Sequence, residues 1–164
     1  MPDRSELIVR EPLECERAWI AQQLCSWWGS TLIVTSNGCW ETSQLPALVA
    51  VDGDAVVGVA TFEIRDRACQ LITLNAVETV RGVGSALLAG VADQAKGSGC
   101  ERLWLTTTND NLDALRFYQR RGLRIAAVHS DAVDAARAIK PTIPLVGDYG
   151  IPIHDELELE LRLD

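Results

Sequence analysis

Three runs rich in β-branched residues follow one another in the middle of the chain, and they constrain the fold more than any other feature of the sequence. The first two runs, 47–51 and 55–64, flank Asp52-Gly53-Asp54. An Asp-Gly pair between two such runs is a strong local signal of a β-hairpin, because glycine adopts the positive φ that the turn requires. A third run, 69–75, follows the turn at 65–67. The three runs therefore predict an antiparallel meander.

The segment after the meander alternates between helix and strand patterns. A glycine-rich turn at 81–85 opens a helix that extends to Lys96, and a strand at 102–107 follows it. A right-handed strand–helix–strand connection of this kind places its two strands parallel. A helix at 112–121 and a strand at 123–129 come next.

The two ends of the chain add further elements. A short strand at 7–10 and a helix at 14–28 precede the meander, and the segment 30–45 is ambiguous between strand and turn. The segment 130–155 is a long excursion pinned by prolines, of the kind that is usually functional or disordered. The alternation of leucine with charged residues over 156–163 predicts a last strand with one buried face, and its glutamates read most simply as the solvated face.

Composition and charge limit the class of protein. The 164 residues are 48% hydrophobic with a net charge of −8, which fits one soluble mixed α/β domain over 1–164 and argues against nucleic-acid or anionic-membrane partners. No stretch approaches the roughly 18 consecutive apolar residues of a membrane helix, and the N-terminus lacks a signal-peptide core. Five widely spaced cysteines predict reduced, mostly buried thiols in a cytoplasmic protein. His129 and His154 are the two histidines and lie far apart in sequence, so we expect no metal site.

The turn Gly82-x-Gly84 is the first candidate ligand site. Glycines at a strand-to-helix junction let a ligand approach the backbone, and the first N–H groups of the helix favour phosphate, to which Arg81 adds a positive charge. The chain has no P-loop pattern, and Leu87 stands where a Rossmann fingerprint needs its third glycine. The motif alone is weak, and a purely structural turn is the alternative.

A second motif, Asn111-x-x-Ala114-x-x-x-Tyr118 with Gly122 after it, gives the first one its context. With both motifs, the chain resembles the GNAT superfamily of acyl-CoA-dependent N-acyltransferases over about residues 7–164. The family's Q/R-x-x-G-x-G/A loop is similar to Thr79–Gly84, with Thr79 departing from the usual Q/R. The resemblance implies a mixed α+β, GNAT-like fold with about four helices and a central, mostly antiparallel mixed sheet. The excursion at 140–156 also resembles a subset of bacterial members.

The resemblance also implies roles for particular residues. Acetyl-CoA would be the acyl donor, with its pyrophosphate at the loop and its pantetheine arm along the preceding strand, which would splay from its neighbour. Tyr118 would be the general acid that protonates the departing thiolate, although a core tyrosine is the alternative. Asn111 would hydrogen-bond the pantetheine arm, and it can cap its helix at the same time. The residues implied in donor binding are Leu74, Ala76, Thr79, Arg81, Gly82, Val83, Gly84, Ser85 and Asn111.

The general base is less well defined. We list Glu63, near the end of the second meander strand, while Glu41, Glu78, Glu156 or a water chain are alternatives. Some of the tryptophans in the first quarter of the chain could line an acceptor pocket, although most are expected in the core or on a dimer surface.

Three functions follow from the resemblance. The first is an N-acetyltransferase that moves an acetyl group from acetyl-CoA to a small-molecule or peptide amine by direct attack in a ternary complex, with a homodimer as a candidate assembly. The second is a non-catalytic acyl-CoA-binding sensor or assembly module. The third, a toxin-like acetyltransferase acting on aminoacyl-tRNA, is disfavoured by the net charge of −8.

Overall fold

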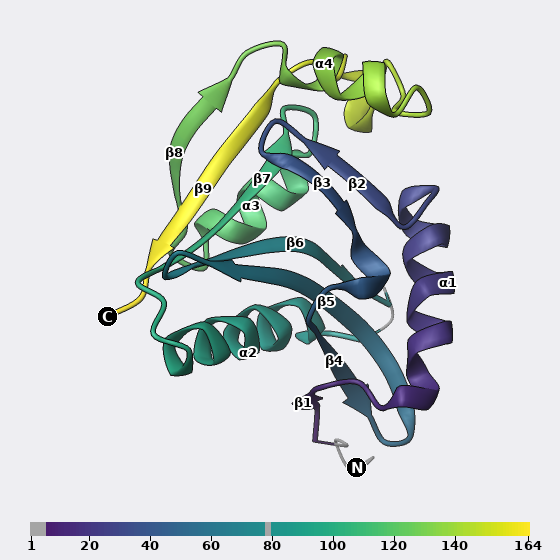
Figure 1. Cartoon of the computed structure of the whole chain (residues 1–164), viewed down its shortest axis with the longest axis vertical. Helices are drawn as coiled ribbons and strands as arrows, with labels where there is room; N and C mark the ends of the chain where they lie inside the picture. Colours follow the sequence, from purple (N-terminus) through teal and green to yellow (C-terminus); the bar gives the residue numbers. More distant parts are fainter. Residues whose placement is uncertain (1–5, 78–79) are drawn as a thin grey trace.

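A seven-stranded sheet with the order β1-β4-β5-β6-β7-β9-β8 forms the centre of the molecule (Figure 1). The computed structural model describes residues 6–77 and 80–164. The parallel pair β6–β7 is flanked by antiparallel pairs throughout the described sheet, so the prediction of a mixed, mostly antiparallel sheet is confirmed. The strands are β1 (Ile8–Arg10), β4 (Ala47–Asp52), β5 (Ala55–Arg65), β6 (Ala68–Ala76), β7 (Arg102–Thr108), β8 (Arg124–His129) and β9 (Glu156–Arg162).

Four α-helices and a small hairpin complete the described part of the chain. The helices are α1 (Arg17–Trp28), α2 (Val83–Gly97), α3 (Leu112–Gln119) and α4 (Ala132–Ile139), with short 3₁₀ turns η1 (Glu14–Glu16), η2 (Thr42–Gln44) and η3 (Asp148–Gly150). The ambiguous segment 30–45 forms the separate hairpin of β2 (Leu32–Thr35) and β3 (Gly38–Glu41). No helix among the described residues is long and apolar enough to cross a membrane.

Helices cover both faces of the meander, with α1 and α2 on opposite sides of β4 and β5 (Figure 1). Side chains alternate between the faces of a strand, so β4 supplies two cores. Leu48 and Ala50 pack in the cluster that contains α2, whereas Val49 and Val51 pack with Ile20 and Leu24 of α1. Burial on both faces explains why β4 reads as a continuous apolar run rather than as an alternating one.

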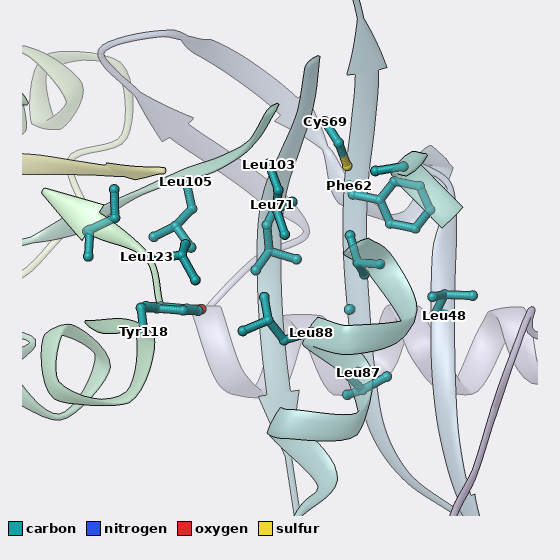
Figure 2. Packing of buried hydrophobic residues seen from close by; sticks show 14 of the residues in the cluster. Leu48, Phe62, Cys69, Leu71, Leu87, Leu88, Leu103, Leu105, Tyr118 and Leu123 are labelled. Carbon is teal, nitrogen blue, oxygen red and sulfur yellow. The ribbon is translucent and has the colours of Figure 1, made fainter. Parts of the chain in front are cut away.

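The buried core on the α2 side holds most of the large apolar side chains (Figure 2). Its members come from β4 to β7, α2, α3 and β9, and include Phe62, Leu87, Leu103 and Leu159, each 1% exposed or less.

Two sequence expectations about polar groups are wrong. Three of the five free cysteines are exposed, so the thiols are not mostly buried.

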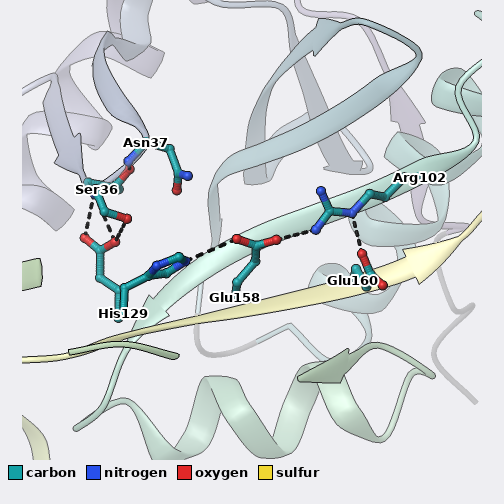
Figure 3. A network of polar contacts seen from close by, with 8 residues as sticks. Ser36, Asn37, Arg102, His129, Glu158 and Glu160 are labelled. Carbon is teal, nitrogen blue, oxygen red and sulfur yellow. Dashed lines mark hydrogen bonds and ion pairs between the residues drawn. The ribbon is translucent and has the colours of Figure 1, made fainter. Parts of the chain in front are cut away.

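The second wrong expectation concerns the glutamates of β9, which are not a solvated face. Glu156 is 3% exposed, and Glu158 and Glu160 both form ion pairs with Arg102 of the neighbouring strand. Figure 3 shows Arg102 between these two carboxylates, with His129 on the other side of Glu158 at 3.3 Å. Glu158 and Glu160 of β9 therefore bind side chains of the neighbouring strands, Arg102 of β7 and, for Glu158, also His129 of β8.

The start of α2 lies directly on β5 because residue 58 has no side chain. A Cβ at Gly58 would overlap Val83 and would lie 2.9 Å from Leu87 Cδ1 and 3.1 Å from the carbonyl oxygen of Asn75. The absence of a side chain at this position therefore allows the N-terminal part of α2 to pack closely against β5.

We expect Gly58→Ala to lower the free energy of unfolding by about 1–3 kcal/mol, because the added methyl group overpacks this contact. Urea unfolding measures the change. Gly97→Ala is the matched control, since a Cβ at Gly97 meets no atom within 4 Å and alanine favours a helix. Equal stability of the two variants would contradict this account of the α2 contact.

Candidate active site

Strands β6 and β7 pair over only a short length and then diverge. The parallel pairing joins Ala68–Gln70 to Arg102–Trp104 and ends there, although β6 continues to Ala76 and β7 to Thr108. On its other edge, β6 stays paired with β5 as far as Ala76. The expected splay is therefore present, and it frees the β7-facing backbone groups of 71–76 to pair with a ligand. Leu74 and Ala76 both lie on this free stretch, half-buried.

The glycine turn after β6 forms the start of α2 as expected. Gly82 has a φ of 84°, and open space surrounds the position that a Cβ would occupy. The Ala86 N–H donates to the carbonyl of the capping Gly82, so the amides of 83–85 belong to the first turn of α2, which precedes the helical hydrogen-bond ladder. Arg81 is exposed beside this turn. Thr79 and Glu78 lie outside the described residues.

The helix start also corrects the alignment of the loop motif. The pattern Q/R-x-x-G-x-G/A fits Arg81-Gly82-Val83-Gly84-Ser85-Ala86 without a departure, two residues later than the match from Thr79. In this register the arginine immediately precedes the helix cap, and Ala86 donates the first helical hydrogen bond. Ala86 is therefore a motif residue that the earlier alignment missed, and the same pattern was the signal for it.

Arg121 is a second cation at the start of α2 that sequence reasoning missed. Its guanidinium donates hydrogen bonds of 2.6 and 2.8 Å to Ser85 Oγ and one of 2.9 Å to the Phe117 carbonyl. It also lies 3.6 Å from the centre of the Phe117 ring. A Cβ at Gly84 would lie 3.1 Å from this same ring. The close approach of the glycine thus brings α3 and its arginine to the helix start, a tertiary contact with no local sequence signal.

The two α3 residues of the second motif take different positions. Asn111 caps the helix, accepting a hydrogen bond of 3.1 Å from the Ala114 N–H, and it also lines a cavity described below. Tyr118 is 9% exposed within the core, and its hydroxyl points from α3 towards Leu88 of α2 (Figure 2). Burial raises the pKa of this hydroxyl above its ordinary value, so the group keeps its proton at neutral pH and can donate it.

A cavity of about 600 Å³, which we call the chamber, opens where β6 and β7 diverge. Gln70 and Ile72 of β6 and residues 106–108 of β7 contribute to its lining. Trp27 and Trp28 at the end of α1 also line it. The excursion at 130–155 supplies the opposite wall through α4 and the segment after it.

Several hydrogen bonds hold this excursion in place. Arg137 of α4 donates to the carbonyls of Ile143, Pro144 and Ile153 at 2.8–3.1 Å. Asn109 donates to the Pro152 carbonyl at 2.9 Å and accepts from two amides, those of residues 154 and 155, at 3.0 Å. The wall is therefore a fixed part of the fold.

Two buried carboxylates line the chamber. Glu156, 3% exposed, accepts hydrogen bonds from the Ser36 amide and, at 2.6 Å, from the Ser36 hydroxyl. Asp110, 5% exposed, accepts from the Thr108 hydroxyl and, at 3.0 Å, from the Asp148 amide. Within residues 6–77 and 80–164, neither carboxylate forms an ion pair with a side chain.

The carboxylates considered as the general base are far from equivalent. Glu63 accepts from the Trp40 indole at 3.1 Å and from Arg65 at 3.0 Å in a separate cavity of about 410 Å³. Glu41 is exposed and bonds to Ser43. The structure does not bring Glu63 or Tyr118 to the chamber, whereas it does place Glu156 in its lining.

One group of possible metal ligands occurs among the described residues, at Asp131, His154 and Asp155. The His154 ring lies 2.8 Å from the Asp155 carboxylate, and that hydrogen bond raises the pKa of the histidine. Asp155 also accepts a hydrogen bond from the Asp131 amide, just before α4. These contacts give the group a structural role within the excursion.

Comparison with known proteins identifies relatives over most of the chain. A family model described as "Acetyltransferase (GNAT) family" matches residues 13–123. The Bacillus subtilis (strain 168) protein YdhI is 40% identical over 138 residues, which cover 84% of this chain and 86% of YdhI.

Solved structures agree at the level of the fold. A Bacillus subtilis acetyltransferase in complex with CoA is similar with a TM-score of 0.71 and 19% identity, covering 97% of this chain and 100% of that one. An IAA acetyltransferase from Bacillus cereus is similar with a TM-score of 0.69 and 21% identity, covering 96% and 100%. The extent of the family match, together with the identity to YdhI, establishes that the chain belongs to the acetyltransferase (GNAT) family.

Proposed function

We propose that this protein is an N-acetyltransferase that moves an acetyl group from acetyl-CoA to an amine by direct attack in a ternary complex. The observation that carries the proposal is the divergence of β6 from β7, which lies between the first turn of α2 and the chamber. Family membership and the CoA complex of the Bacillus subtilis structural relative support acetyl-CoA as the donor.

The residues near the start of α2 fit a pyrophosphate. The first-turn amides of Val83, Gly84 and Ser85 lie at the positive end of the helix dipole, and open space adjoins Gly82. Arg81 and Arg121 add two positive charges there. The unpaired backbone of β6 around Leu74 and Ala76 would hydrogen-bond the amide groups of the pantetheine arm, with Asn111 on the other side of the gap.

Tyr118 would protonate the departing sulfur. The amine nitrogen bonds to the acyl carbon as the carbon–sulfur bond breaks, and the ammonium gives up two protons in all. One of these protons is released to solvent. The other replaces the proton that Tyr118 gives to the thiolate, so the tyrosine ends the cycle protonated. Burial raises the pKa of the phenol, which makes it a weaker acid but keeps its O–H available at neutral pH as a hydrogen-bond donor to the developing thiolate.

We propose Glu156 as the group that accepts the proton of the attacking amine. Glu156 lines the chamber, whereas Glu63 is held by Trp40 and Arg65 in the other cavity. The role of Glu63 as general base stays a prediction, and its place outside the chamber argues against it. The amide and hydroxyl of Ser36 fix the orientation of the Glu156 carboxylate.

Thermal unfolding with and without acetyl-CoA tests the donor assignment. A ligand at a hundred times its Kd stabilises the folded state by about 2.7 kcal/mol, so we expect Tm to rise by several degrees. NAD serves as the matched nucleotide control and should give no shift. No shift with acetyl-CoA would reject the proposal, and a shift without thiol release from any amine would favour the non-catalytic acyl-CoA module.

Tyr118→Phe tests the general acid. We expect kcat to fall about a hundredfold, since the phenylalanine cannot donate a proton, while the Kd for acetyl-CoA stays nearly unchanged. Tyr149→Phe is the matched control, because Tyr149 is the other tyrosine of the chain and bonds to Asp113 at the surface. An equal loss of turnover and of donor affinity would show that Tyr118 has a structural role instead.

Arg121→Ala tests the second cation at the helix start. We expect acetyl-CoA to bind about tenfold more weakly, with a shallower dependence of Kd on salt, because one charge–phosphate contact is lost. The neighbouring Arg120→Ala is the control, since Arg120 is an exposed residue just after α3 and its loss changes the net charge equally. Isothermal titration calorimetry measures both, and equal Kd values for the two variants would remove Arg121 from the donor site.

A further inference from the structure

The chamber carries an excess of negative charge that nothing in the described chain neutralises. Three carboxylates line it, those of Glu156, Asp110 and Asp148, against the ammonium of Lys140. That ammonium donates to the carbonyl oxygens of Leu32 at 2.8 Å and Trp28 at 3.4 Å, and burial lowers its pKa. Lys140 is therefore committed to the backbone at the end of α1, and it is no counter-ion for Glu156 or Asp110.

Buried carboxylates without a cation are unfavourable in a folded protein. Removing an ionised group from water costs several kcal/mol unless charge pairing and hydrogen bonds compensate. Ser36, Thr108 and the Asp148 amide supply hydrogen bonds but no positive charge. A cationic ligand in the chamber would supply the missing charge.

The remaining lining combines apolar and aromatic side chains with uncharged polar ones, mainly threonines of β7. Trp27 and Trp28 contribute from α1, Ile72 from β6, Val133 from α4, and Ile143 and Pro144 from the segment after it. Surfaces of this kind stabilise the apolar body of a ligand through burial and contact with aromatic rings. The chamber thus combines an anionic region at Glu156 with apolar walls.

The size and rigidity of the chamber favour a small molecule over a polypeptide. Its volume of about 600 Å³ lies within the range of about 300–1,000 Å³ that is typical of small-ligand sites. The wall at 140–153 is tied to Arg137 and Asn109 by its backbone, so it does not fold away without breaking those hydrogen bonds.

From these observations we infer that the acceptor is a small organic cation, a primary amine on an apolar body, held inside the chamber with its ammonium at Glu156. The inference rests on the proposed function and names the acceptor class for it. A polyamine without an apolar body and a peptide N-terminus are the competing classes.

Calorimetric titration tests the acceptor class without turnover. The probes are 2-phenylethylamine, the neutral 2-phenylethanol with the same body, putrescine with charge but no aromatic body, and a hexapeptide with a free N-terminus. Each is titrated into the protein alone and into its complex with CoA, which has no acyl group to transfer. We expect 2-phenylethylamine to bind at least about tenfold more tightly than the other three probes.

Charge-removing variants locate the ammonium. Glu156→Gln keeps an oxygen that accepts from Ser36 but loses the charge, and we expect it to weaken binding of 2-phenylethylamine about tenfold or more. Asp148→Asn, at an exposed carboxylate of the same lining, should weaken it a few-fold. Glu101→Gln is the control, since Glu101 pairs with Arg67 on the surface and changes the net charge equally. An unchanged Tm shift with acetyl-CoA checks that each variant is folded.

Several outcomes would overturn the inference. Equal affinity for the amine and the alcohol would remove the role of the charge, and tighter binding of putrescine or the hexapeptide would assign a competing class. Equal affinity of the Glu156→Gln and Glu101→Gln variants would place the ammonium elsewhere. If no amine bound while acetyl-CoA still raised Tm, the acceptor inference would fail and the donor assignment would stand.

Discussion

The short parallel pairing of β6 with β7 is the constraint on which the rest of the site depends. Three residues of each strand pair, and the strands then separate while each keeps its antiparallel neighbour on the other side, β5 for β6 and β9 for β7. Those outer ladders hold the two strands apart, so the sheet cannot close the gap by pairing. The result is a break in a continuous sheet, with unpaired backbone on β6 and the chamber beside it.

Close packing, made possible by missing side chains, positions the helices around this break. Gly58 lets the start of α2 rest on β5, and Gly84 lets α2 approach the Phe117 ring of α3. Arg121 then reaches Ser85 across the same contact. The N-terminus of α2 and the motif residues of α3 are thereby held as one unit next to the gap, although Gly84 and Asn111 are 27 positions apart in the sequence.

The sequence predicted the elements of the fold well where local signals were strong. The meander, the parallel unit and the helix ends near Gly29 and Gly82 follow from turn chemistry and apolar periodicity, and the structure has them. The position of β9 between β7 and β8 has no local signal, because strand order depends on long-range packing. For the same reason, alternation in β9 indicated a solvated glutamate face, whereas Arg102 and Ser36 approach that face from elsewhere in the chain.

The order of the last two strands has a consequence for how the protein forms during synthesis. Within the described sheet β8 pairs with β9, which the ribosome makes after it, and Glu156 is the first residue of β9. A domain generally folds as a unit. Strand β8 therefore gains its pairing partner only after the last strand has been synthesised, because β9 lies between β7 and β8 in the sheet. The chamber likewise has no Glu156 until then, so its buried carboxylate and the position of β8 both depend on the end of the chain.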